Sequence, residues 1–493
     1  MQNKRDQVQA HMFVMGRLAS AMLRAEPDAP ESPSGRTNRA TSLSVIIALI
    51  LCAGAFVFGL LKPGGNTSWR TSGDLIVSKE TGTRFVYLNG RLRPVRNYAS
   101  ALLLADGNLK TTTVGDNSLR GEPHGSPVGI PGAPDTLPSA GDVNSGPWLV
   151  CSGLAPGTGG AVRAVTILAV GNPDPGGAGG ARELGGKESV LVLGPDKTAY
   201  LVWQGRRLRL DDKADAAKAL GYGSVTPRQV SASFLNALPA GPDLASPEVP
   251  GRGDAGPDLG GRRTRIGQVF QVDVPGAAPR YHLLTQDGLV PLTDTGAALV
   301  LGDPRTRATA YAGGTATVAR LGTDALTGHL ASATAVQRAG AGALPQAPPK
   351  AVDVAAGSLA CAGVDAAGGS PRTSTLVLPE EVVGLPAQPP SDEVEPACLD
   401  VDAITVRAGK GALVRALGAA GNVLGDTTYL VTDSGVKYWL PSQEAVKALG
   451  YEGTRPQALP APLLAMLPTG PDLDPESAST GGHVFSMRCK TGK

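Results

Sequence analysis

The chain has 493 residues, of which 66 are glycine and 41 proline, with a formal net charge of +2 and only 4% aromatic residues. This near-neutral balance excludes the basic excess typical of nucleic-acid-binding proteins. No block of like charges forms an acidic or basic tail.

The first 42 residues form a short arm that contains one predicted helix. Apolar side chains recur at helical spacing from Gln7 to Arg24, and Glu26-Pro27 ends the pattern. So short a segment has no core of its own, and its apolar face must dock on a partner, lie on a membrane surface or extend toward the next segment. We favour docking, through five side chains: Val8, Met12, Phe13, Met15 and Leu18.

Residues 43–61 are a continuous apolar run without a charge. As a helix this run is roughly 28 Å long, close to the hydrocarbon thickness of a bilayer. It begins too late for a cleaved signal peptide, which leaves a buried core helix as the alternative to a membrane span. More basic residues precede the run than directly follow it, which favours a cytoplasmic N-terminus and an extracytoplasmic C-terminal region.

The region after the run contains an internal duplication. Tyr200-Leu201-Val202, Ala219-Leu220-Gly221-Tyr222 and Gly241-Pro242-Asp243-Leu244 each recur 229 residues later, for example as Ala448-Leu449-Gly450-Tyr451. A fainter pair joins the segments that begin at Arg84 and Arg280. We interpret this as two halves of about 200 residues, each with a short module, a cysteine-bearing core segment and a long module.

The long modules have a legible local pattern. Tyr200–Trp203 and Arg206–Leu210 predict a hairpin, and Asp211 or Asp212 caps a predicted helix that runs to Leu220. Thr226-Pro227 is expected to open a second helix. The second copy repeats the plan, with strands from Tyr429 and Val436 and helices over 442–449 and 463–467.

Four further segments are rich in β-formers and are expected to build one central domain from both halves: 162–170, 189–193, 375–378 and 404–407. Between the modules, Gly/Pro-rich stretches such as 239–261 are expected to be surface loops or spacers, and Arg252-Gly253-Asp254 to be a polar loop within that stretch.

Four cysteines follow the apolar run: Cys151, Cys361, Cys398 and Cys489. An even number suits pairing outside the cell, although free thiols are the alternative, and the sequence leaves three pairings open. Because Cys151 and Cys361 lie in corresponding core segments, we expect them to join the halves, with Cys398 and Cys489 as a second candidate pair.

The residues offer no catalytic, cofactor-binding or metal-binding constellation. The nearest approach to a phosphate-binding loop, Gly185-Gly186-Lys187-Glu188, has Ala181 in place of the first glycine and a carboxylate in place of the metal-binding hydroxyl. The five histidines lack metal-ligand spacing, and His282 is expected to be a partly exposed strand residue. Asp243 and Asp472 are expected to stabilise turns.

The order of these features resembles the EccB family, the membrane subunit of the type VII (ESX) secretion system. The resemblance rests on Arg5-Asp6-Gln7-Val8-Gln9-Ala10, the following helix, the single span and the repeated Ala-Leu-Gly-Tyr modules. The inserted loops and the extra Cys398 and Cys489 depart from the family. It implies an α+β fold in which a single transmembrane helix precedes an elongated extracytoplasmic region with a β-rich central core and four small repeats in a quasi-two-fold arrangement. The implied division is an arm (1–42), a transmembrane helix (43–61), repeats at 62–120, 199–250, 262–338 and 427–475, core parts at 121–198 and 350–426, and a tail at 476–493.

The resemblance also implies a non-catalytic structural role in the inner-membrane secretion complex. The implied partners are an EccC-type ATPase, EccD, EccE, further copies of the chain and the lipid bilayer, with no cofactor and no nucleic acid. ATP hydrolysis is associated with some family members. Two alternatives therefore stay open: a membrane-anchored module that binds peptidoglycan, and an ATP hydrolase.

Overall fold

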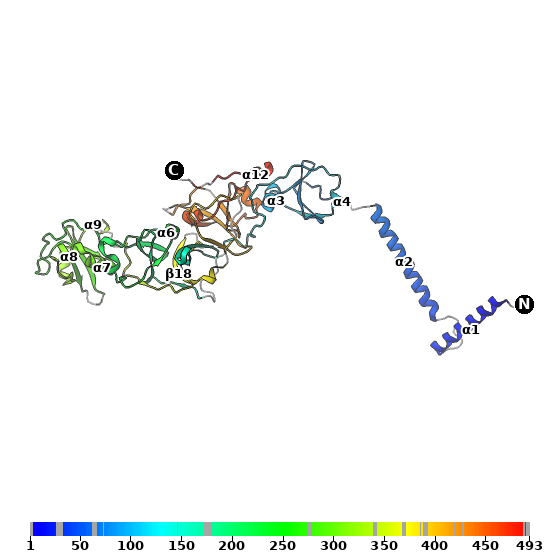
Figure 1. The fold of residues 1–493 in the computed structure, drawn as a ribbon, viewed down its shortest axis with the longest axis horizontal. Helices are drawn as coiled ribbons and strands as arrows, with labels where there is room; N and C mark the ends of the chain where they lie inside the picture. Colours follow the sequence, from blue (N-terminus) through cyan, green and yellow to red (C-terminus); the bar gives the residue numbers. More distant parts are fainter. Residues whose placement is uncertain are drawn as a thin grey trace. The chain divides into compact units, whose positions relative to one another are not determined.

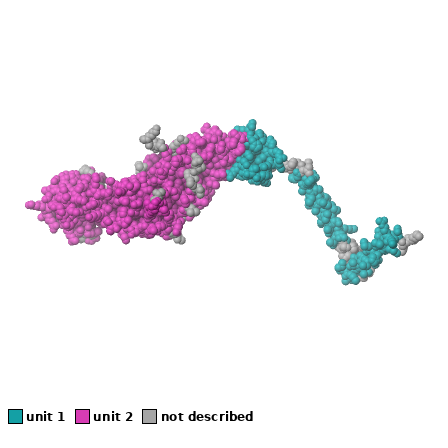
Figure 2. Space-filling model, viewed as in Figure 1, with its two compact units in different colours: residues 1–92, 111–124 teal, residues 93–110, 125–493 magenta. Residues whose placement is uncertain are grey.

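The computed structural model of the chain describes residues 3–25, 33–61, 67–71, 73–144, 146–171, 180–273, 276, 278–338, 343–366, 371–384, 386–387, 393–418, 421–425, 428–486 and 489. They cluster into two compact units, residues 1–92 with 111–124 and residues 93–110 with 125–493 (Figure 2).

Two long helices open the chain, α1 (Lys4–Arg24) and α2 (Pro33–Leu61) (Figure 1). Within the described residues, α2 holds the one stretch that is long and apolar enough to cross a membrane, Thr37–Gly59. None of its most apolar window is buried inside the protein, which does not fit a buried core helix. The predicted helix over 43–61 is confirmed, and it begins ten residues earlier than the apolar run.

Four small sheets share one strand order, and we call each sheet with its helices a module. In every module the first strand is central, the second and third continue from it as antiparallel neighbours, and the fourth returns parallel to the first on its other side. One helix, or two in the third of these modules, lies between the third and fourth strands because a parallel return needs a crossover connection.

The modules are numbered in chain order. Module 1 holds β1 (Leu75–Ser78), β2 (Arg84–Leu88), β3 (Arg91–Pro94), α3 (Tyr98–Leu104), β4 (Thr111–Val114) and α4 (Asp116–Leu119). Module 2 holds β8 (Glu188–Leu193), β9 (Ala199–Trp203), β10 (Arg206–Arg209), α5 (Ala216–Ala219), β11 (Arg228–Gln229) and α6 (Ala232–Ala237). Module 3 holds β12 (Val269–Val272), β13 (Arg280–Thr285), β14 (Gly288–Leu292), α7 (Asp294–Gly302), α8 (Pro304–Thr309), β15 (Ala319–Leu321) and α9 (Ala333–Arg338). Module 4 holds β20 (Ala412–Leu417), β21 (Thr428–Val431), β22 (Lys437–Leu440), α10 (Gln443–Ala448), β23 (Gln457–Pro460), α11 (Ala461–Ala465) and α12 (Pro475–Thr480).

A six-stranded sheet joins the two halves of the second unit, in the order β19-β6-β5-β17-β18-β7. Its centre consists of two hairpins, one from each half, that meet along β5 and β17. Cys151 faces Cys361 across this meeting line, and the two form a disulfide. The strands are β5 (Trp148–Pro156), β6 (Val162–Val170), β7 (Arg182–Glu183), β17 (Ser358–Asp365), β18 (Arg372–Pro379) and β19 (Ala403–Val406).

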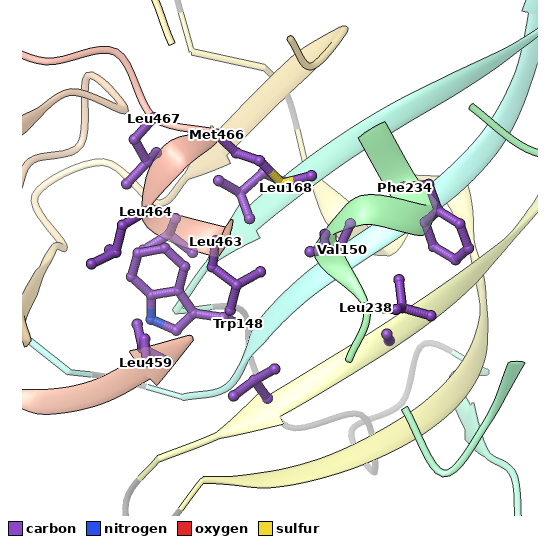
Figure 3. Packing of buried hydrophobic residues seen from close by; sticks show 14 of the residues in the cluster. Trp148, Val150, Leu168, Phe234, Leu238, Leu459, Leu463, Leu464, Met466 and Leu467 are labelled. Atoms are coloured by element: carbon purple, nitrogen blue, oxygen red, sulfur yellow. The ribbon is translucent and has the colours of Figure 1, made fainter. Parts of the chain in front are cut away.

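The strand alternation of β5 sends its side chains to two different cores. Trp148 and Val150 face a cluster that also takes α6 from module 2 and α11 from module 4 (Figure 3). Leu149 and Cys151 face the opposite cluster, which contains Cys361 and is built by the sheet itself. Modules 2 and 4 therefore pack on the central sheet through α6 and α11.

The second disulfide joins Cys398 to Cys489, so the structure holds the pairing that the sequence favours among three. Among the described residues Cys52, on α2, is the one free cysteine.

Several local predictions are confirmed and several are wrong. The hairpin over 200–210 forms as β9 and β10, and Ser442 caps α10. Thr226-Pro227 does not open a helix: the next residues form β11, and α6 begins only after Ser231, whose hydroxyl accepts from the amide of Phe234 at 3.0 Å. The helix expected from Asp212 to Leu220 is broken at Asp215, where φ is 48°.

Residues 189–193 do not join the central sheet as predicted. They form β8, the central strand of module 2, whose start also pairs with β16 (Lys350–Ala351). The predictions for 162–170, 375–378 and 404–407 are confirmed, because β6, β18 and β19 are strands of the central sheet.

The stretch 239–261 is packed and is not a simple spacer. Leu244 and Leu259 are fully buried, and Leu210 pairs with Leu244. Arg252 is nearly buried as well, and its guanidinium donates to the Asp303 carboxylate at 2.7 Å and to the Thr306 hydroxyl at 2.6 Å. The Arg-Gly-Asp sequence is thus part of the anchor of this segment on module 3.

Candidate functional site

The candidate docking surface lies on α1. All five side chains predicted for it are exposed: Val8 (62%), Met12 (71%), Phe13 (68%), Met15 (55%) and Leu18 (54%). The helix begins after Asn3, whose carbonyl accepts from the amide of Asp6 at 2.8 Å, and it ends at Ala25, where φ is 55°. A helix with so many uncovered apolar side chains lacks the burial that would stabilise it, so a partner protein or a membrane surface is expected to cover it.

Helical geometry does not place these five side chains on one face. Val8, Met12 and Met15 lie within about 60° of one another's direction around the axis, and Leu18 lies about 60° beyond Met15. Phe13 lies about 140° from Val8, beside Arg17 on the other side. Val14, Met22 and Leu23 are also exposed, so apolar surface surrounds much of the helix.

The repeated Ala-Leu-Gly-Tyr block forms the same kind of junction in both halves. Ala219, at the end of α5, lies against Gly302 at the end of α7, where a Cβ added to the glycine would come 2.2 Å from the Cβ of Ala219. Ala448, at the end of α10, lies against Gly107 after α3, with its Cα 3.3 Å from an added Cβ. The first contact joins helices of two modules and leaves no room for a Cβ at Gly302, whereas the second joins α10 to the turn after α3 and would be tight.

The tyrosine of the block fixes a third segment at each junction. The Tyr222 hydroxyl donates to the Pro349 carbonyl oxygen at 2.6 Å, and the Tyr451 hydroxyl donates to the Pro138 carbonyl oxygen at 2.7 Å. Both hydroxyls are buried, which raises the pKa of Tyr222 to about 12. The duplicated block therefore joins neighbouring modules. This structural role accounts for its recurrence without a catalytic role.

A family model for the type VII secretion system ESX-1 transport transmembrane domain B matches residues 2–484. The chain belongs to the EccB family of type VII secretion-system membrane subunits. The match begins before α1 and ends in the tail that follows α12, so it includes α1, the candidate span in α2 and all four modules.

Curated EccB relatives align with almost the whole chain. The ESX-3 secretion system ATPase EccB3 of Mycolicibacterium smegmatis is 28% identical over 483 residues, with 95% of this chain and 89% of the relative covered. The ESX-5 secretion system ATPase EccB5 of Mycobacterium tuberculosis is 28% identical over 500 residues, with 98% and 94% covered.

Solved EccB structures share the fold. A chain of an EccB3 dimer from the ESX-3 core complex superposes with a TM-score of 0.62 at 25% identity, covering 82% of this chain and 99% of that one. A chain of an intact ESX-5 inner membrane complex gives a TM-score of 0.61 at 24% identity, covering 100% and 98%.

The segment nearest to a phosphate loop is occupied by contacts within the protein. Arg182 donates to both carboxylate oxygens of Glu188 at 2.8 and 3.0 Å, and this pairing holds the pKa of Glu188 below its ordinary value. The indole of Trp203 donates to the Gly186 carbonyl oxygen at 2.8 Å. A phosphate cradle is built from backbone amides with a lysine and a hydroxyl, and the Glu188 carboxylate at the hydroxyl position would repel a phosphate.

The other side chains considered for chemistry are scattered. His282 is 5% exposed on β13, so the expectation of a partly exposed residue is wrong. The described residues contain no group of three histidine, cysteine, aspartate or glutamate side chains placed to hold a metal ion.

The turn aspartates of the two copies have different partners. Asp243 is exposed and pairs with Arg209 at 2.7 Å, whereas Asp472 is 3% exposed and accepts from the amide of Ser486 at 3.1 Å. The prediction that both carboxylates stabilise their own turn is therefore wrong, because Asp472 binds an amide 14 residues further along the chain and Asp243 binds a side chain.

One cavity of about 610 Å³ opens beside Arg228 and is lined mainly by apolar side chains. The guanidinium of Arg228 donates to the carbonyl oxygens of Val354 and Ser358 at 3.4 and 2.8 Å, which fixes it as a structural group. Sequence patterns missed this arginine and the junction glycines, because neither belongs to a repeat or a motif.

Proposed function

We propose that the chain is a non-catalytic structural subunit of the type VII secretion complex in the inner membrane, where it links the cytoplasmic and extracytoplasmic parts of the machine. The observation that carries this proposal is the placement of an uncovered apolar helix, α1, directly before the candidate span α2. A partner that binds α1 is thereby coupled to the large region that follows the span.

The proposed topology is single-pass, with a cytoplasmic N-terminus. Two disulfides lie after α2, and disulfides persist in oxidising compartments outside the cytoplasm. The basic residues that precede the span agree with this orientation.

The proposed partners are an EccC-type ATPase, EccD, EccE and further copies of this chain. The support comes from structural relatives, one described within an ESX-5 inner membrane complex and one as an EccB3 dimer. We keep the predicted domain division as a proposal, with β8 and β20 assigned to modules 2 and 4 because they pair with the strands of those modules.

The relatives named above are called ATPases. We propose a structural role for this chain all the same, because its sequence contains no G-x-x-x-x-G-K-[ST] loop. Glu188 and Gly186, in the nearest approach to one, are bonded within the protein.

The experiment is a co-purification of the full-length chain carrying Met15→Asp, with Ala10→Asp as the matched control. Both variants add one negative charge to an exposed position of α1, but Ala10 lies about 160° from Val8, on the side of the helix opposite Val8, Met12 and Met15. We expect Met15→Asp to lose the other subunits and Ala10→Asp to keep them, because an unpaired charge is costly to bury in an apolar interface.

Unchanged co-purification of Met15→Asp would contradict docking through this face. An ATPase assay of the purified wild-type chain tests the structural role: a turnover that a single substitution in this chain abolishes would make it an enzyme.

A further inference from the structure

The C-terminal tail is tied to module 4 at two places. The first tie is Asp472, whose carboxylate accepts from the Ser486 amide at 3.1 Å and from the Ser486 hydroxyl at 2.5 Å. The amide of Asp472 in turn donates to the Val484 carbonyl oxygen at 2.8 Å. The second tie is the Cys398–Cys489 disulfide.

Asp472 differs in its contacts from the corresponding residue of the first copy of the duplicated block. Its counterpart Asp243 is 51% exposed and forms an ion pair with Arg209. In module 4 the corresponding residue, Asp472, is buried and binds the tail.

The loop that carries Cys398 is itself fixed to module 4. Glu395 and Thr469 exchange two backbone hydrogen bonds, each 2.9 Å long, and the amide of Leu399 donates to the Ala465 carbonyl oxygen at 2.9 Å. The disulfide therefore closes a ring in which both ends of the tail segment 473–489 are held by the same module.

Helix α12 lies inside this ring and packs on α3. Ala478 of α12 is buried in one cluster with Ala99 and Leu103 of α3, and its carbonyl oxygen accepts from the Gly129 amide at 2.9 Å. Whatever holds the tail in place also holds α12 against α3.

The two disulfides differ in access. Cys151 and Cys361 are completely buried in the central sheet, whereas Cys398 is exposed and Cys489 is half-buried. Access of the attacking thiolate controls the rate of thiol–disulfide exchange. A reductant can therefore reach the tail bond without opening the central one.

We propose that the Cys398–Cys489 disulfide is a thiol-sensitive latch that holds residues 481–486 on module 4 and thereby keeps α12 on α3. The reductant is a dithiol. One of its thiolates attacks the sulfur of one cysteine, which forms a mixed disulfide and releases the other cysteine as a thiolate. The second thiolate of the reductant then attacks the reductant sulfur of the mixed disulfide, which releases the remaining cysteine and leaves the reductant as a cyclic disulfide. Both cysteines end as thiols, each with one proton gained from the reductant or solvent.

The test uses the full-length chain in detergent with Cys52→Ser, which removes the free thiol and leaves both disulfides. Dithiothreitol is titrated, free thiols are trapped with iodoacetamide, and the alkylated peptides of all four cysteines are measured by mass. We expect Cys398 and Cys489 to be alkylated at about a tenth or less of the reductant that Cys151 and Cys361 require.

Amide exchange is then measured at a reductant concentration that reduces Cys398–Cys489 but not Cys151–Cys361. It shows whether the tail and α12 loosen when the tail disulfide is opened. We expect exchange to rise about tenfold or more in 472–486 and in α3, with β5 and β17 unchanged. Cys489→Ser, which opens the latch without reductant, should reproduce this pattern. Ser486→Ala, which removes only the hydroxyl contact, should give a smaller rise.

Reduction of both disulfides together would overturn the proposal. Unchanged protection of 472–486 after the tail bond is opened would overturn it as well. The titration on the folded oxidised chain decides the matter even where Cys489→Ser does not fold.

Discussion

Substituting Gly302 by alanine is expected to strain the junction between modules 2 and 3. The new Cβ would lie 2.2 Å from the Cβ of Ala219 and 3.0 Å from its Cα. Carbon atoms pack at about 3.5–4.0 Å, so one helix must move by more than 1 Å or the contact must open. Overpacking of this kind costs about 1–3 kcal/mol.

The same helix offers a matched control. Gly296→Ala also replaces a glycine of α7, but there the nearest atom to the new Cβ is a Leu292 methyl group at 3.5 Å, an ordinary contact. Because alanine is the better helix former by about 1 kcal/mol, Gly296→Ala is expected to be neutral or stabilising. Gly302→Ala shares that gain, so its net loss is expected to be about 0–2 kcal/mol, which leaves it about 1–3 kcal/mol less stable than Gly296→Ala.

The assay is native-state amide exchange on the full-length chain, which gives a local opening free energy. The reporter amides are Leu220, which donates to Ala216, and Asp303, which donates to Leu299. Ala219→Gly should rescue Gly302→Ala, with a favourable coupling energy of about 1–3 kcal/mol in the double-mutant cycle. Equal protection in the two alanine variants, or a coupling energy near zero, would refute the junction.

Two further predictions concern cross-linking and pH. Replacing Cys151 and Cys361 together by serine removes a link between residues 210 apart and is expected to cost up to about 5 kcal/mol in the chain-entropy model, whereas Cys52→Ser should leave thermal unfolding unchanged. A melting temperature within about 2 °C of wild type would contradict this. Burial lowers the pKa of His282 below its ordinary 6.5, so the unfolded chain binds more protons between the folded pKa and 6.5. Module 3 is therefore expected to lose stability as the pH falls through this window, and His282→Gln, followed by exchange in β13, should flatten that dependence.

The hairpins could be predicted because their patterns are local, and the duplication could be predicted because the same block occurs twice in the sequence. Tyr200–Leu210 alternates as a strand pair, and the block around Ala219 recurs at a constant offset. The family could be recognised from the order of features along the chain, because that order can be read without knowing which residues are in contact.

The sheet that residues 189–193 join could not be predicted in the same way. A short apolar run predicts a buried strand but does not say which sheet it joins, and β8 joined module 2. The two-residue strand β11 exists because β8 offers a parallel edge, which overrides the capping signal at Thr226-Pro227.

The missed site residues share a physical reason. Gly302 matters because Ala219 is close to it in space, and His282 is buried because its module covers it. The exposed side chains of α1 could be predicted because a stripe of apolar residues on a short arm has nothing to pack against within its own segment.

The most direct test of the structural role is affinity purification of the tagged chain from its native membrane in mild detergent, with native mass measurement and identification of every subunit. We expect a large particle that contains several copies of this chain, an EccC-type ATPase and a polytopic membrane subunit. Recovery of the chain only as a monomer or homodimer would contradict the proposed role in the secretion complex.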